Sequence, residues 1–161
     1  MFSWEHVCSA IEDKIFFCAV IGYAHENTIY SDLTGRFPIQ SYKGMNYIFV
    51  AYVYKLNSIL LRSMKSREDA STMEAFTSIY TELEAAGHKP KLHVLDNECS
   101  RAVQNFLIKK GTAIQNAEAH NHKVNAAEPE VKTAKYHITA HVATLDHQCP
   151  IQLWSKMLQQ M

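Results

Sequence analysis

The chain has 161 residues, of which 47% are hydrophobic and 11% aromatic, so it can bury the core of one domain but has no room for two. Sixteen basic residues balance sixteen acidic ones, and this neutral charge argues mildly against a stand-alone nucleic-acid-binding protein. The four cysteines form no C-x-x-C pair, which argues against a zinc finger and against a disulfide framework. We therefore expect reduced thiols and no zinc site.

The only membrane-like stretch, residues 15–24, has about ten residues, roughly half of what a spanning helix needs. Glu5, Glu12 and Asp13 precede it, where a signal peptide would carry positive charge. We therefore expect an intracellular protein that does not contact a membrane. Residues 1–27 show no sustained periodicity and have no assigned role, whereas residues 28–161 are expected to form the domain.

From residue 28 onward the sequence predicts regular structure. Three apolar, β-branched or aromatic runs, 28–33, 46–54 and 58–64, predict a three-strand meander. Ser66 is expected to open a helix, and Gly87 to end it. The elements expected after it are a strand at 91–95, a helix at about 102–110, a strand at 112–115, a helix from 125 to about 142 and a last helix at about 151–158.

This order of elements favours an α/β fold. Three strands followed by alternating helices and strands suit a five-stranded mixed sheet with helices on both faces. An RNase H-like fold is compatible with that order, although the order alone does not require it.

Three carboxylates are candidates for chemistry. Asp32 lies inside the first strand, Asp96 at the carboxyl end of the fourth, where α/β sheets tend to place functional groups, and Glu128 in the first turn of the helix that follows a His-rich loop. Carboxylates that converge from separate elements can hold two Mg²⁺ ions for phosphodiester chemistry. Each also has a structural interpretation: Asp32 begins a turn, Asp96 caps a helix, and Glu128 completes a capping box with Asn125.

Three strings in the same order resemble the integrase core of copia-type retrotransposons. They are Tyr-Ser-Asp-Leu-Thr-Gly at 30–35, Leu-Asp-Asn-Glu at 95–98 and Asn-Ala-Ala-Glu at 125–128. The family carries its first two catalytic Asp residues and its third carboxylate in such strings, and the separation of Asp96 from Glu128 fits the family's spacing. Residues 46–50 and 150–154 are also similar, so the resemblance covers about residue 28 to the C-terminus.

The resemblance implies an RNase H-like fold and a metal-binding catalytic triad of Asp32, Asp96 and Glu128. The implied reaction is 3′-end processing of element DNA followed by strand transfer into target DNA, with two Mg²⁺ or Mn²⁺ ions. The implied partners are element ends, target DNA and further copies of the chain in a homodimer or higher oligomer. The implied location is the nucleus or a cytoplasmic particle.

Basic and histidine residues flank the third carboxylate. Lys132 and Lys135 follow Glu128 by four and seven residues and share its helix face. Spacing alone favours a solvated face, whereas the resemblance implies contact with DNA phosphates, which fixes position and carries no sequence information. His120 and His122 belong to a string that lacks the rest of an HNH nuclease motif, and a polar surface loop is favoured over a catalytic role. The pair resembles the family's loop, which implies contact with DNA or with water near the metals.

The sequence departs from the family at Pro129, where a basic residue is common. At the expected fourth helical position this proline forfeits an amide and restrains Glu128 away from α geometry, which predicts a misaimed Glu128. The integrase zinc-binding domain has no counterpart before residue 28, and no basic region follows the core before Met161. A fragment is the simplest interpretation, and missing domains would explain the neutral charge.

Two other hypotheses stay open. One is a degenerate or co-opted domain that keeps the fold as a binding module without catalysis, which Pro129 favours. The other is an RNase H-like nuclease acting on RNA–DNA hybrids. It is disfavoured because that class generally uses an additional carboxylate, which the sequence does not identify.

Overall fold

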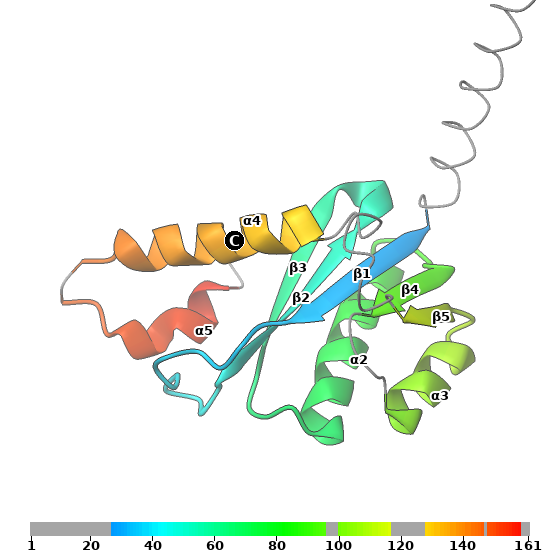
Figure 1. Cartoon of the computed structure of the whole chain (residues 1–161), viewed down its shortest axis with the longest axis horizontal. Coiled ribbons are helices and arrows are strands. Elements are labelled where there is room, and N and C mark those ends of the chain that lie inside the picture. Colours follow the sequence, from blue (N-terminus) through cyan, green and yellow to red (C-terminus); the bar gives the residue numbers. More distant parts are fainter. Residues whose placement is uncertain (1–26, 96–99, 117–127, 147, 159–161) are drawn as a thin grey trace, which may run out of the picture.

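The computed structural model describes residues 27–95, 100–116, 128–146 and 148–158, and for residues 128, 130 and 131 only the backbone. Its centre is a five-stranded sheet in the order β3-β2-β1-β4-β5 (Figure 1). The strands are β1 Thr28–Leu33, β2 Tyr47–Val53, β3 Ser58–Met64, β4 Leu92–Leu95 and β5 Ala113–Asn116.

The sheet is mixed, and β1 is the strand at which its direction changes. β1 is antiparallel to β2, which is antiparallel to β3, whereas β1 is parallel to β4 and β4 to β5. The carboxyl ends of β1, β4 and β5 therefore lie at one edge, where α/β proteins tend to place functional groups. The predicted meander and mixed sheet are confirmed.

Helices cover both faces of the sheet, as predicted (Figure 1). On one face lie α2 (Asp69–Ala85) and α3 (Arg101–Lys109). On the other lie α4 (Glu128–Ala143) and α5 (Trp154–Met157), the latter preceded by a 3₁₀ turn at Ile151–Leu153. None of the helices in the described part of the chain is both long and apolar enough to cross a membrane.

Strand β1 supplies side chains to both cores, because successive residues of a strand point to opposite faces. Ile29 is fully buried in the core beneath α2 and α3. Tyr30 is buried in the core beneath α4 and α5. The same alternation assigns Ser31 to the α2 face and Asp32 to the α4 face.

The ends of α2 differ in how well the sequence predicted them. The prediction that Ser66 opens this helix is wrong: Glu68 occupies the N-cap without a side-chain cap, and the Ser66 hydroxyl lies 3.2 Å from that of Ser71. Gly87 terminates the helix as expected. Its φ of 73° is left-handed, and the next amide, of His88, donates to the Leu83 carbonyl at 2.8 Å.

The last helix is shorter than predicted. The sequence indicated one helix over about 151–158, but the structure has a three-residue 3₁₀ turn followed by the four-residue α5. Tertiary contacts anchor this short segment, since Trp154 and Leu158 are both buried in the core beneath α4 and α5. Packing, rather than helix length, therefore fixes its place.

Candidate active site at the carboxyl end of strand β1

Asp32 lies one residue before the end of β1, opposite Val50 of β2. Its side chain is 24% exposed, and its Oδ2 accepts a hydrogen bond from Lys135 Nζ at 3.2 Å. The carboxylate is therefore reachable from solvent and has a positive charge beside it. A turn-forming role does not account for this position, because the strand continues through Leu33.

Lys135 comes from α4, and its neighbours explain how that helix is held against the sheet. Ala134 and Ile138 are 3% and 5% exposed and pack in the core beneath α4. Lys135 itself is 47% exposed, and a partly exposed pair of this kind contributes about 0.2–1 kcal/mol. The apolar contacts therefore hold α4 in place, and the ion pair defines where the helix meets β1.

The second predicted lysine is oriented differently. Lys132 Nζ lies 5.9 Å from the centre of the Tyr136 ring, in a cation–π contact on the solvent side of α4. Tyr136 is 63% exposed. Of the two lysines, the structure brings Lys135 to Asp32 and leaves Lys132 at the surface.

The other predicted site residues stay predictions. Asp96, His120 and His122 lie outside the described residues. Glu128 is the first residue of α4, and its side chain is not among those described. The residue before Asp96 is placed, however: β4 ends at Leu95, which pairs with Ser31 of β1.

The described part of α4 begins at Glu128 and continues through Pro129. Residues 117–127 lie outside the described residues, so the prediction that Pro129 is the fourth helical residue and misaims Glu128 stays a prediction. Within the described helix, Pro129 makes one side-chain contact. Its carbonyl accepts from the Thr133 hydroxyl at 2.9 Å. Pro129 is therefore compatible with α4 as it stands.

Sequence reasoning missed a buried polar chain behind the site. His93 of β4 is fully buried, with Nδ1 3.0 Å from the Tyr80 hydroxyl and Nε2 2.9 Å from the Ser31 hydroxyl. Burial lowers the pKa of His93 to about 3, so the ring is neutral. Through Ser31 the chain ends directly beside Asp32, on the opposite face of the sheet. A histidine inside an otherwise apolar strand was the available signal.

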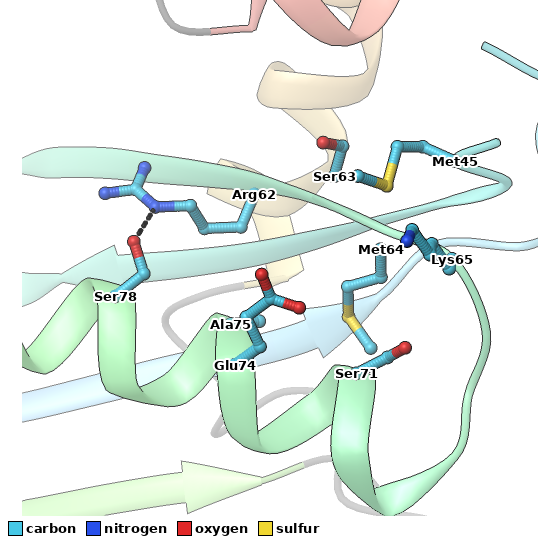
Figure 2. Close-up of a pocket in the computed structure, with 9 residues that line it drawn as sticks. All are labelled: Met45, Arg62, Ser63, Met64, Lys65, Ser71, Glu74, Ala75 and Ser78. Carbon is cyan, nitrogen blue, oxygen red and sulfur yellow. Dashed lines mark hydrogen bonds between the residues drawn. The ribbon is translucent and has the colours of Figure 1, made fainter. Parts of the chain in front are cut away.

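A small pocket lies elsewhere on the molecule. Its volume is about 100 Å³, and β3 and α2 line it (Figure 2). Arg62 Nε donates to the Ser78 hydroxyl across its rim at 2.8 Å. The pocket is on the α2 face of the sheet, whereas Asp32 and Lys135 meet on the α4 face, so it is separate from the candidate site.

No protein-family model and no curated protein sequence matches the chain. Solved structures do match. The integrase catalytic core of HTLV-2 in complex with magnesium, in a trimeric form, superposes with a TM-score of 0.59 at 14% identity, over 83% of this chain and 82% of that one. The BIV integrase catalytic core gives 0.59 at 11% identity, over 83% and 80%.

A simian T-cell lymphotropic virus intasome in complex with PP2A regulatory subunit B56 gamma gives a TM-score of 0.59 at 15% identity, over 83% of this chain and 46% of that one. Similarity at such low identity is a similarity of fold. The chain therefore has the RNase H-like fold of integrase catalytic cores, which confirms the predicted fold class.

The described residues permit a partial test of a metal site. Among them no three His, Cys, Asp or Glu side chains gather to hold an ion. Asp32 offers the oxygen donors that Mg²⁺ prefers, and the ammonium of Lys135 already stands beside it as a cation. The described residues therefore supply one carboxylate of the kind that Mg²⁺ binds and no further ligand beside it.

Proposed function

We propose that this chain is the catalytic core of a copia-type retroelement integrase, which processes DNA 3′ ends and joins them to target DNA. The observation that carries the proposal is the contact between Lys135 and Asp32. It joins the carboxyl end of β1 to the helix that begins at Glu128. The fold shared with integrase cores and the three family-like strings support the same reaction.

Chain connectivity supports convergence of the three carboxylates. Asp96 is bonded to Leu95, which pairs with Ser31, so its Cα stands about 3.8 Å beyond a residue beside β1. Because β4 is parallel to β1, the carboxyl end of β4, which Asp96 follows in the chain, lies at the same end of the sheet as Asp32.

Helix geometry supports the third member. Glu128 precedes Lys135 by two turns, about 10 Å along the axis, on the same side of α4. Helical side chains lean toward the N-terminus of their helix, so Lys135 extends from its own turn toward that of Glu128. The carboxylate Asp32, which Lys135 reaches, is therefore on the side of α4 that Glu128 shares.

In this proposal Asp32, Asp96 and Glu128 hold Mg²⁺ or Mn²⁺, and the metal supplies the Lewis acid for phosphodiester cleavage and joining. Lys135 offers its ammonium to a phosphate of the bound DNA, and Lys132 offers a second positive charge one turn nearer Glu128. His120 and His122 are proposed to lie at the edge of this DNA surface. The magnesium in the HTLV-2 core supports the choice of metal.

Assembly and location belong to the same proposal. The trimeric and dimeric forms of the HTLV-2 core and the viral intasome support a homodimer or a higher oligomer on DNA. Residues 28–161 would form the catalytic core, and the protein would act in the nucleus or in a cytoplasmic particle.

The test is resolution of a branched DNA that mimics the strand-transfer product. The purified chain is expected to resolve it only with Mg²⁺ or Mn²⁺. Asp32→Asn and Asp96→Asn should lower the rate by roughly 100-fold or more, because removing a metal ligand forfeits several kcal/mol of charge stabilisation. Resolution is followed on a denaturing gel.

Asp146→Asn is the matched control, because Asp146 is exposed beyond the end of α4 and an asparagine keeps the oxygen that accepts from the Gln148 amide. This variant should retain the wild-type rate. A folded wild-type chain that never cleaves with either metal would contradict catalysis and favour the binding-module hypothesis.

A further inference from the structure

The connection between β1 and β2, residues 34–46, is fastened to the C-terminal segment. The Trp154 indole Nε1 donates to the Ile39 carbonyl at 2.8 Å, and the Tyr42 amide donates to the Gln152 carbonyl at 3.0 Å. The Phe37 ring stacks on Trp154 with centroids 4.5 Å apart. Figure 1 shows this connection beside α5. The connection therefore has a defined shape at its tip.

At that tip two lysines share one aromatic ring. Lys156 Nζ of α5 lies 5.1 Å from the centre of the Tyr42 ring, and Lys43 Nζ lies 5.8 Å from it. Tyr42 is 47% exposed, and both lysines are exposed. Each ammonium group is attracted by the electron-rich face of the ring that it lies over, so Tyr42 gathers two positive charges at the tip.

The described residues supply no carboxylate to either lysine. Within the described part of the chain neither Lys43 nor Lys156 takes part in an ion pair. In the sequence, every charged residue between Asp32 and Glu68 is basic, and Arg36 stands exposed in the same connection. An anionic chain laid across the tip would meet both ammonium groups and supply the negative charge that the described residues do not.

We propose that Tyr42, Lys43 and Lys156 form a phosphate clamp for the backbone of duplex DNA. The inference rests on the proposed function. DNA is favoured over an acidic peptide because the proposed function already gives the chain a DNA substrate, and the connection that carries the clamp leaves β1 directly after Asp32. The exposed ring also gives a flat surface for an unpaired base at a DNA end.

The test measures binding of a fluorescent duplex in EDTA, which separates it from catalysis. Affinity is followed by anisotropy between about 50 and 200 mM salt. The logarithm of the affinity falls as the logarithm of the salt concentration rises, and each lost phosphate contact makes this fall less steep by about 1. The double variant Lys43→Met with Lys156→Met should therefore reduce the magnitude of the slope by about 2. The paired Lys→Arg variant should keep the wild-type slope, since both charges remain.

The matched control is Lys89→Met with Lys109→Met, two exposed lysines outside the loop and α5. It makes the same charge change and should leave the slope as in wild type. Tyr42→Leu should reduce the affinity for the duplex in part, because the two lysines lose the ring that positions them. Tyr42→Phe keeps an aromatic ring and should bind the duplex as wild type does. Circular dichroism establishes that each variant is folded.

Three results would overturn the clamp. The first is an unchanged salt slope in the double methionine variant, and the second is no duplex binding by the folded wild-type chain. The third is displacement of DNA by polyglutamate at equal charge concentration, which would point to an acidic protein partner. Because EDTA removes metal, a chain that binds through the clamp but never cleaves would contradict the proposed catalysis and leave the clamp intact.

Discussion

At the scale of single residues, the candidate site has two sides. On the α4 face Asp32 meets Lys135 in a partly exposed ion pair. On the α2 face, one residue away, Ser31 contacts the buried ring of His93. The partly exposed charge of Asp32 is therefore carried by a strand whose opposite face is fixed by buried polar contacts, and such contacts are costly to break.

The buried His93 predicts a specific pH dependence of stability. Its pKa is about 3 in the folded chain and about 6.5 when unfolded, so the unfolded state binds more protons between these values. The free energy of unfolding should therefore fall as pH decreases from about 6.5 toward 3, and urea denaturation at a series of pH values measures it.

The variant His93→Gln should lose this part of the slope, because the group that titrates on unfolding is gone. His137→Gln, which removes an exposed histidine of α4, is the control and should keep the wild-type slope. Equal slopes for wild type and His93→Gln would show that other groups cause the acid sensitivity.

At the scale of elements, the two ends of α2 differ in how far the sequence predicts them. Gly87 ends α2 in a left-handed conformation with φ 73°, and Pro90 precedes the short strand that carries His93. The sequence predicted this end because glycine adopts that conformation without steric cost. It did not predict the start, because Glu68 begins the helix with no side-chain cap for sequence to reveal.

Gly87→Ala is expected to destabilise the chain by about 1 kcal/mol. A Cβ there meets nothing within 4 Å, so strain in the positive φ is the cause rather than a clash. Gly35→Ala is the matched control, since Gly35 is also in open space but has no positive φ. It should be neutral or slightly stabilising. Chemical denaturation compares the two, and equal effects would contradict the strain argument.

At the scale of the whole molecule, a short C-terminal segment completes the α4 face. Trp154 is 1% exposed, stacks on Phe37 and bonds to the Ile39 carbonyl. It thereby joins α5 to the connection that leaves β1. The proposed clamp depends on this long-range contact, because Tyr42 lies in the connection that Trp154 anchors.

Trp154→Ala should lower the free energy of unfolding by about 3–5 kcal/mol, the usual cost of removing a large buried aromatic side chain. It should also weaken DNA binding, because the connection that carries Tyr42 loses its anchor. Ile108→Ala, at a 66% exposed position of α3, should change stability by less than about 0.5 kcal/mol. A small effect at Trp154 would mean that α5 is not part of the cooperative fold.

The sequence predicted the fold class through local patterns. The runs at 28–33 and 58–64 match β1 and β3 in both bounds, because β-branched and apolar runs specify buried strands directly. It also named Asp32 and Lys135, which the structure brings together, although family resemblance rather than spacing singled them out. It misplaced the start of α2, since helix starts depend on capping contacts that pattern reveals poorly.

What the sequence by itself determined is therefore the set of strands and helices, and the carboxylate that ends up on β1. Only the tertiary structure decided which distant groups meet: Lys135 with Asp32, His93 with Tyr80 and Ser31, and Lys156 with Tyr42. The physical reason is the distance along the chain over which each kind of interaction acts. Periodicity and turn chemistry act over a few neighbouring residues, whereas these contacts follow from the packing of elements that lie far apart along the chain.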